Sequence, residues 1–166
     1  DYQAVDGGED VLDRERHDME DVFLAAARGD DFLGVQTYTR TRIGPDGPRQ
    51  PAVGARVTQM GWEFYPEALE ACLRRAHAVA GVPLMVTENG AAFDDVVTEE
   101  PDGPAVHDID RIDYLRRHFT AAHDRNSQWY GAIKVYLPVL LAGALPWLVF
   151  SLNAAGGPVY AYRTLR

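Results

Sequence analysis

Apolar residues in the first two-thirds of the chain follow two spacings, one typical of helices and one typical of strands. Two continuous runs of apolar, aromatic and β-branched residues, 32–39 and 82–87, predict buried strands. Three stretches with apolar residues three and four positions apart predict helices: Met19, Val22, Phe23 and Ala26 before Gly29; Leu69, Cys72, Leu73, Ala76 and Ala80 between Pro66 and Gly81; and Ile109, Ile112, Leu115 and Phe119 after Asp108. The alternation of strands and helices is typical of parallel α/β units.

Two segments between these elements have the composition of loops. Residues 44–54 are rich in glycine and proline, and residues 91–107 show neither a helical nor a strand pattern. Long loops that follow strands often carry functional residues. We therefore expect a long loop after each predicted strand.

The last part of the chain is apolar. Residues 135–152 are almost wholly uncharged, and about 18 such residues can just span a bilayer, so a membrane helix is one interpretation. Pro138, Gly143 and Pro146 interrupt the run, and residues 133–137 have a strand-like composition. The sequence therefore favours a buried strand followed by a loop over a membrane helix.

Length and composition limit the fold. The chain has 166 residues, of which 46 % are hydrophobic and 25 % charged, which is typical of a globular protein. One domain is expected at this length, whereas a complete (β/α)8 barrel begins near about 200 residues. We divide the chain into an acidic N-terminal helical segment (1–30), βα units (31–125) and an apolar, divergent strand and loop region (126–166), all within one structural unit.

Charge and cysteine content narrow the partners and the compartment. The net charge of −9 gives little attraction for phosphate backbones or anionic lipid, so we expect no nucleic-acid partner. The single cysteine, Cys72, cannot form an internal disulfide, and the first residues do not have the pattern of a leader peptide, so we expect a cytoplasmic protein. The five histidines are not spaced with carboxylates as metal ligands are, so we expect no metal and no cofactor.

One carboxylate stands where parallel sheets place functional groups. Glu88 directly follows the predicted strand 82–87, and the carboxyl ends of parallel strands face the active-site mouth in open sheets and barrels. Tyr38 lies at the corresponding end of the preceding strand, so its hydroxyl reaches Glu88 if the two strands are neighbours. Position alone is equally consistent with a Glu88 that caps a turn or pairs with an arginine, and with a Tyr38 that is an ordinary core tyrosine.

Three ordered motifs resemble a known enzyme family. They are Asp31-Phe32-Leu33-Gly34-Val35-Gln36-Thr37-Tyr38-Thr39, Met60-Gly61-Trp62-Glu63-Phe64-Tyr65-Pro66 and Val86-Thr87-Glu88-Asn89-Gly90. Together they are similar to the C-terminal part of the family 1 glycoside hydrolases, the retaining β-glucosidase family, over residues 18–125. The resemblance implies an α/β fold that contributes only the C-terminal strands and helices of a (β/α)8 TIM-type barrel.

The resemblance also implies roles for three residues. Glu88 corresponds to the catalytic nucleophile of the Thr-Glu-Asn-Gly motif, and Tyr38 to the tyrosine that donates a hydrogen bond to it. Trp147 matches a substrate-binding position of the family. A retaining glycosidase needs an ionised carboxylate that attacks the anomeric carbon and a second carboxylic acid, roughly 5 to 5.5 Å away, that protonates the leaving oxygen.

The chain departs from the family pattern in two regions. The family's acid lies in an Asn-Glu-Pro motif, and no Asn-Glu-Pro occurs among the 166 residues. In the apolar tail, Tyr136 and Trp147 match the family. By this resemblance, Val139 replaces a tryptophan that stacks on the sugar and Pro146 a glutamate that binds its hydroxyls, and Gly143 and Ala144 replace an Asp-Asn pair.

These observations predict a C-terminal fragment or truncated relative of a β-glucosidase, which hydrolyses O-glycosyl bonds with retention but is inactive alone because the acid/base segment is absent. The expected ligand is a β-glucoside or a related sugar. Because a partial barrel leaves sheet edges open, we expect self-association or binding to a complementing N-terminal half. The alternative is a non-catalytic carbohydrate-binding remnant or a module tethered to a membrane by its tail.

Overall fold

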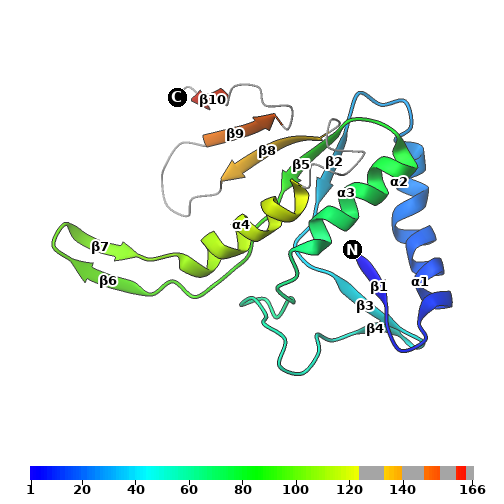
Figure 1. Ribbon diagram of the computed structural model, residues 1–166, viewed down its shortest axis with the longest axis horizontal. Coiled ribbons are helices and arrows are strands. Elements are labelled where there is room, and N and C mark those ends of the chain that lie inside the picture. Colours follow the sequence, from blue (N-terminus) through cyan, green and yellow to red (C-terminus); the bar gives the residue numbers. More distant parts are fainter. Residues whose placement is uncertain (124–132, 140–147, 154–159, 164–166) are drawn as a thin grey trace.

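The computed structural model describes residues 1–123, together with the backbone of strands β8 (Ile133–Val139), β9 (Leu148–Asn153) and β10 (Tyr160–Arg163). A five-stranded sheet of order β10-β9-β8-β5-β2 forms its centre (Figure 1). Strands β2 (Leu33–Gln36), β5 (Leu84–Glu88) and β8 run parallel, so the predicted α/β arrangement is confirmed. Strands β9 and β10 add to β8 in antiparallel orientation, which departs from the all-parallel strand ring of a (β/α)8 barrel.

Helix α3 (Glu67–Ala80) forms as the sequence predicts. Pro66 precedes its first turn, and Gly81 ends it in the left-handed region with φ 69°, where its N–H donates to the His77 carbonyl at 2.9 Å. The buried face of α3 packs on β2 and β5, and the resulting core consists of Val35, Leu69, Leu73, Ala76, Leu84, Val86 and Ala122. This packing fixes the two parallel strands whose carboxyl ends carry the candidate site.

The helix predicted before Gly29 is part of a longer helical segment. Helix α1 (Glu9–Arg16), the short π-helix η1 (His17–Asp21) and helix α2 (Val22–Ala26) follow one another without a break. Helix α2 contacts α3. The apolar spacing here does not mark a buried face, because Met19, Val22 and Phe23 are 58 %, 51 % and 66 % exposed. These three residues form an apolar stripe on the outer surface of the helical segment.

Helix α4 (Ile109–Ala122) begins after Asp108 as predicted, and its buried residues differ from the apolar ones that mark its start. Ile109 and Ile112 are 71 % and 62 % exposed, whereas Tyr114, His118 and Ala122 are buried. The buried residues recur every four positions and so share one face of α4, and α4 packs against α3 (Figure 1). The apolar spacing that starts at Ile109 therefore indicated the helix but did not mark its buried side.

Both predicted loops contain β-hairpins. Strand β3 (Thr41–Gly44) ends where the first predicted loop begins and pairs with β4 (Gly47–Arg49) inside it, and β1 (Tyr2–Ala4) joins β3 in parallel. Strands β6 (Val97–Glu100) and β7 (Gly103–Val106) pair within the second and project away from the rest of the molecule (Figure 1). Each hairpin turns through a Pro-Asp-Gly sequence, 45–47 and 101–103, and the glycine of each has φ 112°.

The apolar tail contains strands where the structure describes it. Strand β8 confirms the strand predicted at 133–137, and β9 covers the end of the apolar run. Residues 140–147 lie outside the described residues. No helix within the described residues is long and apolar enough to cross a membrane.

Candidate active site

The candidate site lies where β2 and β5 end side by side. The strands pair in register from Leu33 with Leu84 to Val35 with Val86, and then a register shift brings Gln36 opposite Glu88. Gly34 permits this close pairing, since a Cβ at that position would lie 3.2 Å from a methyl group of Thr87. The shift places Glu88 at the carboxyl end of β5, beside the chain that leaves β2.

Tyr38 and Glu88, which the sequence analysis expected to be near each other, are in contact. The Tyr38 hydroxyl donates a hydrogen bond to Oε2 of Glu88, and the Glu88 side chain is exposed. Partial burial, together with the hydrogen bond to Glu88 and its negative charge, raises the pKa of Tyr38 to about 12. The phenol therefore stays protonated near neutral pH and remains a donor to the carboxylate.

A tryptophan that the residue-by-residue reasoning did not single out completes this surface. The ring of Trp62 lies 5.6 Å from the ring of Tyr38 at an interplanar angle of 42°, and Trp62 is 40 % exposed. A half-exposed indole beside the Tyr38 ring offers a flat apolar surface to a ligand. In the sequence, the signal for this tryptophan was its place directly after Gly61. In the structure, Gly61 has a φ of 75° and turns the chain back on itself.

An ion pair joins the tyrosine segment to the tryptophan segment. Arg40 binds the Glu63 carboxylate through two hydrogen bonds of 2.8 and 2.9 Å, and the Thr39 hydroxyl donates to the Glu63 carbonyl at 2.8 Å. These bonds hold the pKa of Glu63 below its usual value, chiefly through Arg40. Since Thr39 follows Tyr38 and Glu63 follows Trp62, the pair holds the two rings beside each other.

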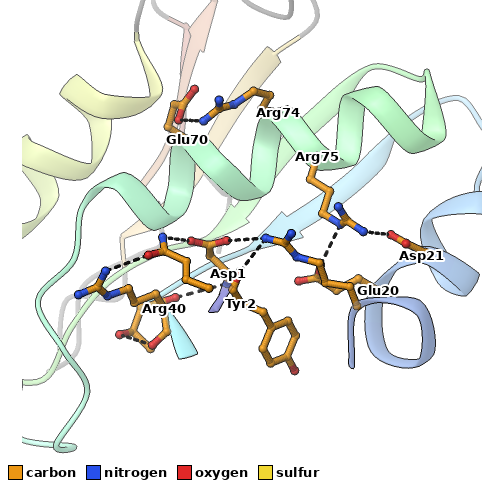
Figure 2. A network of polar contacts seen from close by, with 11 residues as sticks. Asp1, Tyr2, Glu20, Asp21, Arg40, Glu70, Arg74 and Arg75 are labelled. Carbon is orange, nitrogen blue, oxygen red and sulfur yellow. Dashed lines mark hydrogen bonds and ion pairs between the residues drawn. The ribbon is translucent and has the colours of Figure 1, made fainter. Parts of the chain in front are cut away.

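Arg40 is also part of a wider polar network. Its Nη1 donates to Gln3 at 2.8 Å, Gln3 donates to Asp1 at 2.6 Å, and Arg40 stacks 3.9 Å from the centre of the Tyr65 ring. Figure 2 shows Arg40 and Asp1 in this network. From Asp1 it continues to Arg16 of α1, whose Nη2 lies 3.9 Å from the Asp1 carboxylate and donates to the Tyr2 carbonyl at 2.6 Å. The network connects the candidate site to β1 and to the N-terminal helical segment.

The segment that carries Trp62 is fixed to α4 from the other side. Arg56 binds Asp110 at 2.6 Å and Asp113 at 3.0 Å, and its guanidinium lies 4.0 Å from the centre of the Phe64 ring. Arg116, Arg117 and Arg56 together hold the pKa of Asp113 well below its usual range. Trp62 therefore lies between two anchored ends of one loop.

The described residues around Glu88 form an open surface. Two hollows, of about 700 Å³ between α3 and α4 and about 400 Å³ beside Phe93 and Val96, include neither Tyr38 nor Glu88 in their walls. Ligand pockets surround most of a bound small molecule, and the described residues alone do not form such an enclosure at Glu88. Trp147 lies outside the described residues, and within them no group of three or more His, Cys, Asp or Glu side chains could hold a metal ion.

Comparison with known proteins identifies the family. The sequence profile of glycosyl hydrolase family 1 matches residues 21–147, and the chain belongs to this family. Among curated proteins, it is similar to beta-glucosidase A of Thermotoga maritima (42 % identity over 98 residues, covering 55 % of this chain and 21 % of that protein). It is also similar to a bifunctional beta-D-glucosidase/beta-D-fucosidase of Bifidobacterium breve (52 % identity over 68 residues, covering 40 % and 15 %).

Solved structures show the same relationship for the fold. Beta-glycosidase BGL167 superposes with a TM-score of 0.63 at 47 % identity, covering 73 % of this chain and 26 % of that one. A beta-glucosidase from Thermotoga maritima in complex with a substituted glucoimidazole superposes at 0.60 with 26 % identity, covering 73 % of this chain and 35 % of that one. The expected fold class is thus confirmed: the chain is a partial α/β segment of a TIM-type barrel, and it spans 21 % and 15 % of the length of these two curated relatives.

Proposed function

We propose that this chain provides the nucleophile side of a retaining β-glucosidase site, with Glu88 as the nucleophile and Tyr38 as its hydrogen-bond donor. The observation that carries the proposal is the contact between these two side chains, at the adjacent carboxyl ends of two parallel strands, within the Thr87-Glu88-Asn89-Gly90 motif. A carboxylate at such a strand end is open to a ligand that approaches the barrel mouth.

The chemistry follows from the two side chains. The ionised Glu88 attacks the anomeric carbon, a glycosyl ester forms, and the bond to the leaving oxygen breaks. Tyr38, held protonated by its raised pKa, stabilises the ionised carboxylate and restricts its orientation. Water then attacks the ester, which releases the sugar with its original β configuration and regenerates Glu88.

The chain alone is expected to turn over unactivated glucosides poorly or not at all. Its sequence has no Asn-Glu-Pro motif to supply the acid that protonates the leaving oxygen. General acid catalysis contributes about 10²- to 10⁴-fold, and ordinary alkoxide leaving groups depend on it. Relatives named as beta-glucosidases support a β-glucoside or related sugar as the substrate class.

The missing acid implies a complementary part of the barrel, and one surface of the chain fits it. In the described part of the chain, β2 has a single strand neighbour, β5, so its other edge is open. Phe32, at the start of this edge, is 51 % exposed, and the outward stripe of Met19, Val22 and Phe23 lies on the helical segment that leads into β2. We propose that the βα units preceding β2 in a family 1 barrel cover this edge and this stripe.

Covalent trapping tests the proposed nucleophile. The chain is incubated with 2,4-dinitrophenyl 2-deoxy-2-fluoro-β-glucoside, whose leaving group needs no acid, and analysed by intact and peptide mass spectrometry. One added fluoroglucosyl group, on the peptide that contains Glu88 and absent in Glu88→Gln, supports the proposal. Absence of labelling contradicts it and favours the alternative of a non-catalytic carbohydrate-binding remnant.

Two expectations about location accompany the proposal. A membrane-tethered module remains the other form of the alternative, and partition of the full chain, but not of residues 1–125, into membranes would support it. We propose instead a cytoplasmic protein, on the basis of a composition with Cys72 as the single cysteine.

A further inference from the structure

We infer that Tyr114 and Asn89 are positioning residues that hold the Tyr38 hydroxyl against Glu88. The inference deepens the proposed function, because it concerns the side chain that contacts the proposed nucleophile. Its basis is a closed ring of contacts that joins the end of β5, helix α4 and the chain that leaves β2.

The ring begins where β2 leaves the sheet. Gln36 is the last residue of β2 to pair with β5, so the carbonyls of Thr37 and Tyr38 have no strand partner there. Buried or half-buried carbonyls need donors from elsewhere. The Asn89 side-chain amide donates to the Thr37 carbonyl at 2.6 Å, and the Tyr114 hydroxyl donates to the Tyr38 carbonyl at 2.5 Å.

Tyr114 is itself tightly held. It is fully buried, its ring stacks on His118 with centroids 3.8 Å apart, and Phe64 meets it edge-on at 5.3 Å. Burial raises the pKa of its hydroxyl, the nearby Tyr38 raises it further, and a hydrogen bond with Asn89 opposes both effects. Tyr114 is therefore a fixed, protonated donor on α4.

The contacts close on the nucleophile. Asn89 follows Glu88 in the chain, and its side-chain amide donates to the Thr37 carbonyl. Tyr114 holds the Tyr38 backbone, and the Tyr38 hydroxyl returns to Glu88. A displacement of the Tyr38 backbone, which would carry the ring away from Glu88, therefore stretches or breaks the hydrogen bonds from Asn89 and Tyr114.

A merely structural role for Tyr114 and Asn89 makes a different prediction. If the two side chains only satisfy carbonyl groups, their removal lowers stability but leaves the Tyr38 hydroxyl on Glu88 in the molecules that remain folded. If they position Tyr38, the hydrogen bond to Glu88 weakens within the folded state. The Tyr38 hydrogen bond is thus the quantity to measure.

The experiment uses the full chain with tyrosine labelled with ¹³C at Cζ, observed by NMR at neutral pH without any sugar. Tyr38→Phe identifies the Tyr38 resonance, and Glu88→Ala gives its position when the hydrogen bond is lost. Tyr114→Phe removes one hydroxyl and keeps the ring. We expect it to move the Tyr38 resonance at least half of the way from the wild-type to the Glu88→Ala position.

Two further variants complete the test. Thr120→Val is the control, because it also removes a hydroxyl from α4. Among the described residues, this hydroxyl donates to the Arg116 carbonyl and not to the site, so the Tyr38 resonance should stay at its wild-type position. Asn89→Ala should move the resonance in the same direction as Tyr114→Phe, and it decides the matter if Tyr114→Phe does not fold.

A wild-type Tyr38 resonance in folded Tyr114→Phe, or in folded Asn89→Ala where the first variant does not fold, overturns the inference. Because no sugar is present, this outcome is independent of covalent trapping. Trapping can fail while the resonance moves, or succeed while the resonance stays in place. The failure of the inference and the failure of the proposed function are therefore distinguishable.

Discussion

Tyr38 is the single residue on which the chemistry at Glu88 depends most, since its hydroxyl is the described donor to the carboxylate. Hydrogen bonds to charged groups are worth about 1.5 to 3 kcal/mol. Tyr38→Phe should therefore slow trapping of Glu88 by the fluoroglucoside about 10- to 100-fold, measured as the rate of mass increase. Tyr65→Phe, which leaves the Tyr38–Glu88 contact in place, serves as the control, and an equal loss in both variants would contradict this role.

The raised pKa of Tyr38 also predicts how stability depends on pH. A tyrosine with a pKa of about 12 in the folded chain and about 10 in the unfolded chain favours folding below pH 10 and loses this contribution between pH 10 and 12. In Tyr38→Phe, the free energy of unfolding should therefore fall less between pH 10 and 12 than in the wild-type chain. Urea unfolding at pH 9 and pH 11.5 measures it, and an identical pH dependence in the two proteins would refute the prediction.

Individual residues of the site were predictable from the sequence only where a motif marked them. Glu88 and Tyr38 stand at the ends of apolar runs, so their proximity followed from parallel pairing of the two strands. Tyr114 and Asn89 reach the site through the packing of α4 and the register shift after Val35, which no local pattern encodes. The residue roles of Glu88, Tyr38 and Trp147 remain predictions.

At the scale of elements, packing explains which predictions succeeded. The spacing in 66–80 matched a helix because α3 buries that face on two strands, and Pro66 and Gly81 define its ends. The spacing of Met19, Val22 and Phe23 gave a helix whose apolar stripe is exposed, because no described element covers it. Apolar spacing therefore indicated helices correctly but not the side that is buried in this chain.

The hairpins were missed because their strands are short and lack an apolar alternation, although Pro-Asp-Gly marked both turns.

The two turn glycines with φ 112°, Gly47 and Gly103, should differ in how much their substitution lowers stability. Gly47→Ala should lower the free energy of unfolding by about 1 kcal/mol or more, because β3 lies between β4 and β1. Gly103→Ala should open the projecting β6–β7 hairpin and change global unfolding less. Thermal unfolding of both variants tests this, and an equal loss in both contradicts it.

The ion pair between Arg40 and Glu63 predicts the largest effect on stability among the contacts that frame the site. The Glu63 side chain is 10 % exposed and is bound through both carboxylate oxygens. Arg40→Met leaves this carboxylate without its partner and should cost about 3 kcal/mol of stability. The matched surface change Arg74→Met removes an exposed pair with Glu70 and should cost less than about 1 kcal/mol. Urea unfolding compares the two, and equal costs would exclude a structural role for the Arg40 pair.

At the scale of the whole molecule, the described residues form a parallel α/β segment in which β2 is one edge strand of the central sheet, and beyond β8 this sheet continues into antiparallel strands. The division into segments 1–30, 31–125 and 126–166 stays a prediction. Strand β9 pairs along β8 on the side away from β5, which leaves the open edge of β2 for the partner we propose. The apolar stripe beside that edge specifies where the partner should bind.

This surface gives a prediction for binding. The chain is mixed with the part of Thermotoga maritima beta-glucosidase A that precedes its matched segment, and complex formation is measured by sedimentation. The stripe variant Phe23→Asp should weaken the complex at least about tenfold, because an exposed anchor residue of an interface becomes a buried charge. Val97→Asp, on the projecting hairpin, should have no effect. Failure of the wild-type chain to form this complex, or equal binding by both variants, contradicts the proposed surface.

The most direct measurement of the central claim, that this chain has the nucleophile but lacks the acid, is the release of dinitrophenolate from 2,4-dinitrophenyl β-glucoside with and without azide. We predict a burst of about one equivalent per chain, followed by slow release that azide accelerates, because azide attacks the glycosyl ester without a general base. The azide product should be the β-glucosyl azide, and methyl β-glucoside should not react. Release no faster than that of Glu88→Ala would contradict the assignment of the nucleophile, and steady turnover of methyl β-glucoside would show that the chain supplies its own acid.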